Sequence, residues 1–357
     1  MIDKSFWKGR RVFITGHTGF KGSWLTILLD HLGANLKGFA LLPPTQPNLF
    51  TVAKVNELIE SEIGDIKNLE KISESISAFR PEIVIHMAAQ SLVRYSYDEP
   101  IETYSVNALG TAHVLEAAKN CDSVRAVISV TTDKCYENKE WVWAYRENDP
   151  MGGYDPYSSS KGCAELITSS YRKSFYKDKG IGLASVRAGN VIGGGDWAID
   201  RLVPDVLRAF EKNQPVLVRN PNAIRPWQHV LEPLSGYLKL TELLYDDANQ
   251  YSEGWNFGPN EQDAKDVSYI VEYMVEAWPE KATWKLDDTV IQPYEANYLK
   301  LDISKARQKT GWQPSWILEE SLNKTIDWHV AWLDKKDMQA FTKNQISQFM
   351  THQEVTK

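Results

Sequence analysis

Short apolar segments alternate with segments of helical periodicity through the first half of this 357-residue chain. The apolar segments, which we expect to be strands, are residues 11–15, 36–41, 82–89, 125–130 and 182–188. Between them, apolar side chains recur every three or four residues, as they do along one face of a helix. Strands that are apolar on both faces are typical of parallel sheets that helices cover on each side. The alternation therefore predicts an α/β fold built on a doubly wound parallel sheet.

The pattern changes after Asn190, where a glycine-rich stretch begins. Beyond it we expect two isolated strands, at 215–221 and 282–287, and three helices, at 232–246, 266–278 and 317–333. We interpret this half as a smaller α+β substrate lobe. The expected division is a first domain at 1–189, to which 229–260 returns, and a second lobe formed by 190–228 and 261–357.

The overall composition narrows the possible partners. Hydrophobic residues make up 43% of the chain and charged residues 24%, as in ordinary globular proteins. The net charge is −7 and there is no basic tract, so we expect no nucleic-acid partner. No apolar stretch has membrane-spanning length, so we expect no membrane partner. Three cysteines without metal-type spacing (Cys121, Cys135 and Cys163) favour a cytoplasmic protein that holds no metal.

Three glycines, Gly16, Gly19 and Gly22, lie between the first expected strand and the first expected helix. Glycine permits a tight turn and lets the backbone approach a diphosphate, while the helix N-terminus offers free N–H groups. The spacing is G-x-x-G-x-x-G, which differs from the common G-x-G-x-x-G fingerprint. We favour a nucleotide cofactor at this turn over a turn with packing duties only.

The residues after the second expected strand give no choice between NAD and NADP. Neither an acidic residue for ribose hydroxyls nor an arginine for a 2′-phosphate stands there. Asp65, which follows the expected third strand, could reach the adenine edge of a cofactor. An equally good interpretation is that Asp65 caps the next helix.

Two groups of polar residues could transfer protons. Tyr157 and Lys161 are four residues apart in an expected helix, so the ammonium should stand beside the phenol and lower its pKa. A tyrosine of this kind can take a proton from an alcohol while hydride leaves the carbon. Thr132, Asp133 and Lys134 directly follow an apolar strand. They form either a solvated turn or a second set of proton-handling groups.

With these motifs in place, nearly the whole chain resembles the extended short-chain dehydrogenase/reductase family. The resemblance is carried by "TGHTGFKGSWL", "GDI", "HMAAQ", "NALGTAHVLEAA", "YSSSK", "VRAGNVIGGG" and "LDISKARQKTGWQPSW". Within the family the chain is similar to the sugar-nucleotide 4,6-dehydratases. The strings "TTDKCYENKEW", "GGYDPYSSSKGCAEL" and "IRPWQHVLEPLSGYL" look most like the branch that acts on CDP-glucose. The resemblance implies a Rossmann-type first domain, NAD as cofactor and CDP-glucose as substrate.

The resemblance also implies roles for five catalytic residues. Thr132, Tyr157 and Lys161 would form the triad that oxidises the sugar at C4. Asp133 would protonate the departing C6 hydroxyl. Lys134 stands where the dTDP-glucose dehydratases carry the glutamate that removes the C5 proton. A lysine base must be neutral, although its ordinary pKa is about 10.4. Alternatively, Lys134 stays charged and stabilises the enolate, with another group as base.

The binding residues that the resemblance implies fall into two sets. Those expected at the cofactor are Gly16, His17, Gly19, Phe20, Gly22, Asp65, Ile66, Ala88, Ala89, Gln90, Asn107, Tyr157 and Lys161. Those expected at the sugar nucleotide are Asn190, Arg201, Arg225 and His229, with Arg94 as a weaker candidate. For Arg201 and Arg94 a surface position is at least as good an interpretation, and for His229 a core position is the commoner case. We interpret His86, inside an apolar strand, as structural.

Two other functions would use the same fold. A sugar-nucleotide 4-epimerase needs the triad but no second acid–base pair, so Asp133 and Lys134 argue against it. A non-catalytic NAD-binding regulator would not need an intact triad. Homodimers or higher homo-oligomers formed through the helices beside the active site are usual in the family. The resemblance further implies a role in making deoxysugars of bacterial surface polysaccharide, such as lipopolysaccharide O-antigen.

Overall fold

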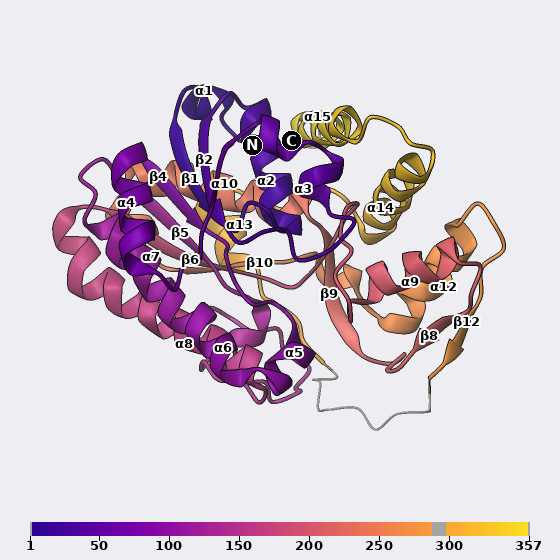
Figure 1. The fold of residues 1–357 in the computed structure, drawn as a ribbon. Coiled ribbons are helices and arrows are strands. Elements are labelled where there is room, and N and C mark those ends of the chain that lie inside the picture. Colours follow the sequence, from indigo (N-terminus) through magenta and orange to yellow (C-terminus); the bar gives the residue numbers. More distant parts are fainter. Residues whose placement is uncertain (1, 288–297, 356–357) are drawn as a thin grey trace.

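Seven parallel strands form the central sheet of the computed structural model, which describes residues 2–287 and 298–355. The strand order is β10-β6-β5-β4-β1-β2-β3 (Figure 1). The strands are β1 (Arg11–Thr15), β2 (Asn35–Ala40), β3 (Glu60–Ile63), β4 (Ile83–His86), β5 (Ala126–Val130), β6 (Gly182–Ala188) and β10 (Gly254–Phe257). This is the doubly wound parallel sheet that the sequence predicts, because the chain reverses its direction of strand addition between β1 and β4.

Alternation along each strand sends side chains into two separate cores. In β1, Val12 and Ile14 belong to the larger core, whereas Phe13 belongs to the core on the opposite face. Helices cover both faces: α2 (Phe20–His31) and α10 (Leu231–Asp246) on the first, and α4 (Leu69–Phe79), α7 (Gly110–Lys119) and α8 (Pro156–Tyr171) on the second. Burial on both sides explains why these strands read as continuous apolar runs.

The smaller lobe contains two short sheets and the helices that pack on them (Figure 1). Its strands are β7 (Asn190–Ile192), β8 (Val216–Val218), β9 (Ile224–His229), β11 (Ala264–Asp266) and β12 (Trp284–Leu286). Its helices are α9 (Leu202–Glu211), α12 (Val267–Ala277) and α14 (Leu318–Leu333). The two strands that we expected to be isolated, β8 and β12, pair with each other. The sequence did not reveal this pairing because the two segments are far apart along the chain.

Short helices complete the chain at its ends and in its connections. They are α1 (Lys4–Trp7), α3 (Leu49–Val52), α5 (Val93–Asp98), α6 (Pro100–Tyr104), α11 (Ala248–Tyr251) and α13 (Ser304–Thr310). The long C-terminal helix is α15 (Met338–Val355). None of the helices in the described part of the chain combines the length and the apolar character needed to cross a bilayer.

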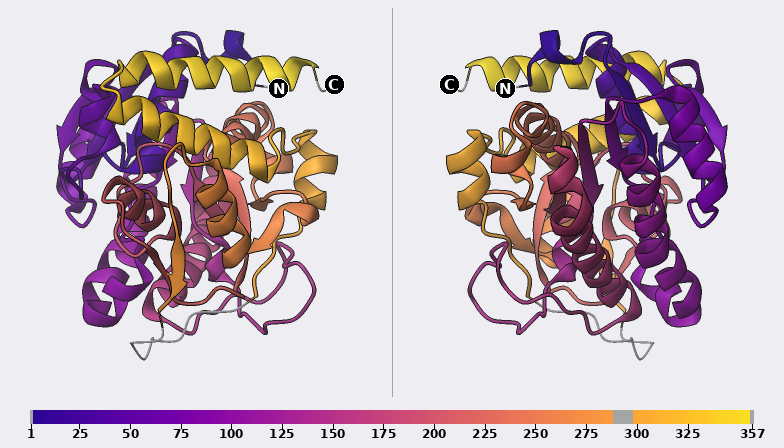
Figure 2. Two further views of the ribbon diagram at one scale, coloured as in Figure 1. Left: turned by 90° about the vertical axis from the view of Figure 1, so that its right-hand side faces the viewer. Right: turned by 90° about the vertical axis from the view of Figure 1, so that its left-hand side faces the viewer.

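The contacts of the second half of the chain bear on the expected division at 189. In 229–260, β10 pairs with β6 and α10 packs on the sheet. However, α13 packs against β10, and α15 packs along both α2 of the first domain and α14 of the smaller lobe. Figure 2 shows α15 lying across the top of the molecule, with both chain termini at that end. The apolar side chains of α15, such as Ile346 and Phe349, complete the larger core, so 261–357 is divided between the two parts.

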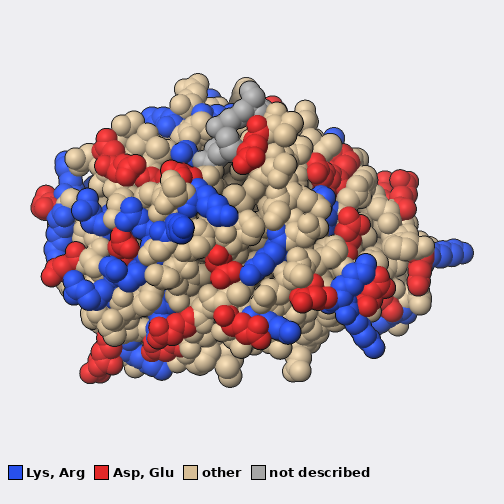
Figure 3. Space-filling view, turned by 90° about the horizontal axis from the view of Figure 1, so that it is seen from above, with Lys and Arg blue, Asp and Glu red and all other residues tan. Residues whose placement is uncertain are grey.

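The surface seen from above carries charges of both signs. On this face Lys and Arg side chains are interspersed with Asp and Glu side chains (Figure 3). The mixed pattern agrees with the modest net charge of −7.

Candidate functional site

The glycine turn after β1 makes an unusually close approach to the loop after β4. Gly16 has φ +79°, and a Cβ there would lie 2.7 Å from the backbone N of Ala88. A Cβ at Gly22 would lie 2.1 Å from the carbonyl oxygen of Gly16. Gly19 is the N-cap of α2 and provides no side-chain cap, so the first N–H groups of this twelve-residue helix remain available to an anion. The turn thus has the form of a phosphate cradle.

Two of the expected cofactor residues belong to this turn and to the start of α2. His17 has no exposed surface, and its Nε2 lies 2.7 Å from the Ser61 hydroxyl. Burial lowers the pKa of His17 to about 4, so the ring is neutral at neutral pH. Phe20 is partly buried against the larger core. Our expectation of a direct cofactor contact is therefore wrong for His17, because core packing encloses the whole residue.

Asp65 and Ile66 lie at the edge of the sheet after β3. Asp65 is partly exposed, and its Oδ1 accepts a hydrogen bond from Lys67 N at 2.9 Å. The cap of α4 is Asn68, which accepts from Lys71 N, so the capping interpretation of Asp65 is wrong. Ile66 packs in the second core. The other carboxylate oxygen of Asp65, Oδ2, lies 3.5 Å from Lys67 Nζ.

A chain of hydrogen bonds holds the loop after β4, which contains Ala88, Ala89 and Gln90. The Thr15 hydroxyl accepts from Ala88 N at 3.2 Å, and it lies 2.7 Å from Nδ1 of His86. His86 also contacts the Thr111 hydroxyl through Nε2 at 3.0 Å. Burial is the main cause that lowers the pKa of His86 to about 3, with the charge of Lys161 acting in the same direction. His86 is thus a neutral structural residue, as predicted.

Asn107 connects this loop to the catalytic helix. Its Oδ1 accepts from Gln90 N at 2.9 Å, and its Nδ2 donates to Gln90 O at 2.8 Å. The same Nδ2 donates to the Ser160 hydroxyl of α8 at 2.9 Å. Asn107 is buried, so the structure makes it a brace for the cofactor loop.

The Thr132–Asp133–Lys134 segment is a buried turn at the carboxyl end of β5. Residues Asp133–Cys135 form a 3₁₀ turn whose N-cap is Thr132. Asp133 is only 2% exposed, and its Oδ1 accepts from the Thr132 hydroxyl at 3.0 Å. Within the described residues, Asp133 Oδ2 has no hydrogen-bond partner. Burial raises the pKa of Asp133, although nearby Lys134 opposes the shift. The interpretation as a solvated turn is wrong.

Tyr157 stands at the start of α8, beside this turn. The N-cap Asp155 accepts from Ser158 N, and Pro156 occupies the first helical position, so the sequence fixes where the helix begins. Tyr157 is 8% exposed, and burial raises the pKa of its phenol to about 12. A hydrogen bond with Thr132 acts in the opposite direction and lowers this pKa. The charge of Asp133 also raises this pKa, and α8 packs against the turn that contains Asp133.

Lys161 lies one helical turn after Tyr157 and is buried. Its Nζ donates to Val130 O at 3.3 Å, and burial lowers its pKa to about 8. The expectation that Lys161 holds the phenol's pKa below its ordinary value is wrong, because burial of Tyr157 has the larger effect. The pair nevertheless occupies the same helix face, as predicted.

The arginines expected at the sugar nucleotide differ in their surroundings. Arg225 is buried in β9 near Asp133, whose pKa it lowers, and β9 pairs with the strand that contains Asn190. Arg201 forms an ion pair with Asp196 at 2.9 Å and donates to the Ser91 hydroxyl. Arg94 forms an ion pair with Asp200 at 3.5 Å.

His229 does not line a pocket. It has no exposed surface and packs between Trp24 and Trp316, with ring centroids at 5.6 and 4.9 Å. Burial lowers its pKa to about 3. Our assignment of His229 to the substrate is therefore wrong, because the tryptophans of the core enclose it.

Sequence reasoning missed Lys21, the second residue of α2. Its charge interacts with those of Arg201, Asp133 and Lys161, so its ammonium lies near the catalytic groups. Burial lowers the pKa of Lys21 to about 8. The sequence did contain a signal for Lys21, because it lies between Gly19 and Gly22. Side chains of such a turn lie at the carboxyl edge of the sheet, where ligands bind.

Comparison with known proteins finds several sugar-nucleotide 4,6-dehydratases that are similar to this chain. The sequence model described as GDP-mannose 4,6 dehydratase matches residues 13–325. The chain is 58% identical to CDP-glucose 4,6-dehydratase of Salmonella typhimurium, covering 98% of this chain and 99% of that protein. It is 23% identical to dTDP-glucose 4,6-dehydratase of Haemophilus influenzae, covering 89% of this chain and 97% of that protein.

Experimental structures of other proteins share the fold. UDP-glucose 4-epimerase of Thermotoga maritima, solved with UDP-glucose, has a TM-score of 0.76 and 22% identity over 90% of this chain and 99% of that one. dTDP-glucose 4,6-dehydratase of Bacillus anthracis, solved with NAD, has a TM-score of 0.71 and 20% identity over 90% of this chain and 97% of that one.

Proposed function

Because this chain belongs to the family described as GDP-mannose 4,6 dehydratase, we propose that it is an NAD-dependent hydro-lyase that converts CDP-glucose to CDP-4-keto-6-deoxyglucose and water. The observation that carries the proposal is the buried Asp133, held beside Thr132 and Tyr157 with Lys134 next to it. An oxidation triad alone needs no such carboxyl. The 58% identity to a CDP-glucose 4,6-dehydratase supports this choice of substrate.

The glycine cradle fits NAD. A side chain at Gly16 or Gly22 would collide with the backbone of Ala88 or of Gly16, so the turn can close only with glycine there. The uncapped N-terminus of α2 suits the diphosphate. Ala88, Ala89 and Gln90, braced by Asn107, would line the cofactor on the sheet side. When bound, NAD⁺ supplies a hydride acceptor for C4 of the sugar and returns the hydride to C6.

Oxidation at C4 would depend on Thr132, Tyr157 and Lys161. Tyr157 takes the proton of the 4-hydroxyl, and the Thr132 hydroxyl relays or orients it. The buried ammonium of Lys161 stabilises the phenolate that must form. Replacing Tyr157 with Phe should reduce turnover by about 10²–10⁴-fold without loss of fold, and near-normal turnover would remove Tyr157 from the mechanism.

Elimination across C5 and C6 would depend on the neighbouring turn. Once C4 is a ketone, the C5 proton becomes acidic. Lys134 removes that proton and returns it to C5 in the last step, and Asp133, whose raised pKa favours the protonated form, donates to the departing hydroxyl to release water. A charged Lys134 that stabilises the enolate, with another group as base, is the alternative.

The sugar nucleotide would lie between the sheet edge and the smaller lobe. Arg225 and Asn190 come from neighbouring strands there, and a guanidinium suits a diphosphate. Arg201, which forms an ion pair with Asp196, is a further candidate.

The deciding experiment is incubation with CDP-, dTDP-, UDP- and GDP-hexoses. We expect a 4-keto-6-deoxy product from CDP-glucose, with no net NADH in solution. A galactose epimer would indicate a 4-epimerase instead, and absence of turnover with every substrate would favour a non-catalytic regulator. NADH that accumulates in proportion to product would contradict the internal return of hydride.

We further propose a cytoplasmic homodimer, or a higher homo-oligomer, that serves deoxysugar synthesis for surface polysaccharide such as O-antigen. Cys121, Cys135 and Cys163 are free thiols, as a reducing compartment favours. Exposed apolar side chains on the helices beside the active site, Ile101, Leu109 and Leu166, support the oligomer.

A further inference from the structure

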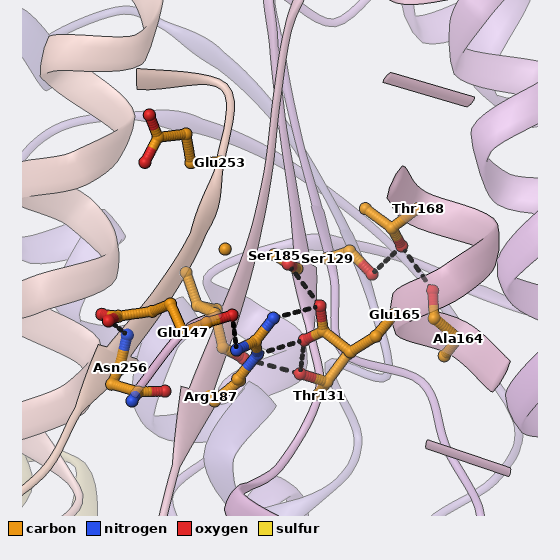
Figure 4. Close-up of polar contacts among 12 residues, drawn as sticks. Ser129, Thr131, Glu147, Ala164, Glu165, Thr168, Ser185, Arg187, Glu253 and Asn256 are labelled. Atoms are coloured by element: carbon orange, nitrogen blue, oxygen red, sulfur yellow. Dashed lines mark hydrogen bonds and ion pairs between the residues drawn. The ribbon is translucent and has the colours of Figure 1, made fainter. Parts of the chain in front are cut away.

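A buried ion pair lies beneath the 132–134 turn. Arg187 of β6 and Glu165 of α8 are each 5% exposed and meet through two contacts, of 2.9 and 2.8 Å (Figure 4). Burial opposes ionisation of Glu165, but the Arg187 charge and the hydrogen bonds outweigh it and lower the pKa to about 2. A buried pair of this kind gives little stability over apolar residues of similar size, so its position calls for another explanation.

Both ends of the catalytic turn are attached to this pair. Thr131, which precedes the turn, donates from Oγ1 to Glu165 Oε1 at 2.5 Å. Tyr136, which follows the turn, accepts from Arg187 Nη1 at 2.6 Å and donates to Asn256 Oδ1 at 2.7 Å. The guanidinium also lies 5.0 Å from the Tyr136 ring centroid. The pair therefore holds the turn from both sides.

The same pair is fixed to the catalytic helix. Glu165 lies one turn beyond Lys161 and two turns beyond Tyr157 in α8. Tyr157 has supports of its own, since its N–H donates to the Ser96 hydroxyl at 3.1 Å. Loosening the pair would thus move the turn relative to the helix backbone that carries the phenol.

We propose that Arg187 and Glu165 are positioning residues that set Asp133 and Lys134 against the sugar for elimination. The inference rests on the proposed dehydratase function and goes beyond it, because neither residue touches a reacting atom. Elimination should depend on the pair more than oxidation does, since Asp133 and Lys134 lie within the clamped turn.

The test removes the two attachments and leaves the pair intact. Thr131→Val and Tyr136→Phe, alone and together, each delete one hydroxyl. Removing Arg187 itself would leave a buried unpaired carboxylate and risk unfolding. Ser185→Ala is the matched control for Thr131, because its hydroxyl donates to the same carboxylate at 2.7 Å but comes from β6. Tyr176→Phe is the control for Tyr136, as it loses a buried phenol hydrogen bond to Leu115 O.

The first readout needs no substrate. Amide hydrogen exchange of the peptide 129–138 should become about tenfold faster in the double variant, and should be unchanged in the two controls. Equal exchange in all variants would overturn the clamp. This measurement decides whether the pair holds the turn even if the wild-type protein does not act on CDP-glucose, which would refute only the proposed function.

The second readout separates the chemical steps. With CDP-glucose deuterated at C5, the isotope effect on kcat should rise in the turn variants, while the effect of deuterium at C4 should fall. Both isotope effects should stay at wild-type values in the controls. An isotope effect is a ratio of rates, so a smaller fraction of folded enzyme does not change it. A purely structural role of the pair would therefore leave both isotope effects unchanged. Isotope effects that stay at the wild-type values in the turn variants would overturn the positioning role.

Discussion

At the scale of single residues, the state of Asp133 decides the chemistry of the site. The carboxyl is buried, one oxygen has no hydrogen-bond partner among the described residues, and burial raises its pKa. A carboxyl in this environment binds its proton more tightly than one in water, as a general acid requires. The sequence placed Asp133 beside Thr132, but burial alone favours its protonated form.

Asp133→Asn should be inactive and more stable than the wild type at neutral pH. The raised pKa means that the folded state binds a proton that the unfolded state releases, so wild-type stability falls as pH rises from the unfolded pKa through the folded one. An amide does not titrate in this range, so it avoids this loss. Thermal unfolding at pH 4 and pH 8 tests this, with the difference expected only at pH 8. A variant less stable at pH 8 would contradict the assignment.

The pH dependence of oxidation should reflect Tyr157 and Lys161 as a pair. The phenol has a pKa of about 12 and the ammonium a pKa of about 8, so the pair first loses a proton near pH 8. Loss of one proton from the pair gives either a phenol with a neutral amine or a phenolate with an ammonium, and the second form is the reactive one. The value of kcat/KM should therefore rise with pH up to about 8 and then level off. In Lys161→Met the rise should move toward the phenol's own pKa. A steady fall in wild-type activity between pH 7 and pH 9 would be inconsistent with this pairing.

At the scale of elements, the junction of β1 and α2 limits which residues the cofactor turn accepts. Gly16→Ala should weaken NAD binding at least about tenfold, because the new Cβ would lie 2.7 Å from Ala88 N and force the turn apart. Gly180→Ala is the matched control: Gly180 also has positive φ (+65°), but a Cβ there meets nothing within 4 Å. Both variants should lose about 1–2 kcal/mol of stability from backbone strain, and only Gly16→Ala should lose affinity in a fluorescence titration. Equal NAD affinities would show that the close approach has no role.

At the scale of the whole molecule, helices α6 and α8 leave an apolar surface uncovered. Leu166 is 62% exposed and Ile101 is 77% exposed. Leu166→Lys should convert the expected dimer to a monomer in size-exclusion chromatography with light scattering, because a charge in an apolar interface costs several kcal/mol. Leu217→Lys, at a site 53% exposed in the smaller lobe, should leave the dimer intact. A monomeric wild type would refute the interface.

Most of the first domain could be predicted because its signals are local. The strand predicted at 182–188 matches β6 residue for residue, since burial on both faces makes such strands continuous apolar runs. The pairing of β8 with β12 and the docking of α15 on α2 could not be predicted, because these contacts join segments far apart in sequence. His229 and His17 were misassigned for the same reason: burial comes from the surrounding elements, and spacing does not reveal it.

The sequence by itself determined the kind of sheet, the glycine turn and the candidate catalytic groups, because periodicity and side-chain chemistry are properties of short segments. Only the tertiary structure decided the ionisation of those groups and their supports. It buried Asp133 and Tyr157, brought Lys21 near them and placed the Arg187–Glu165 pair beneath the turn. A pKa depends on the dielectric and charges that the whole fold assembles around a group, and no local pattern contains them.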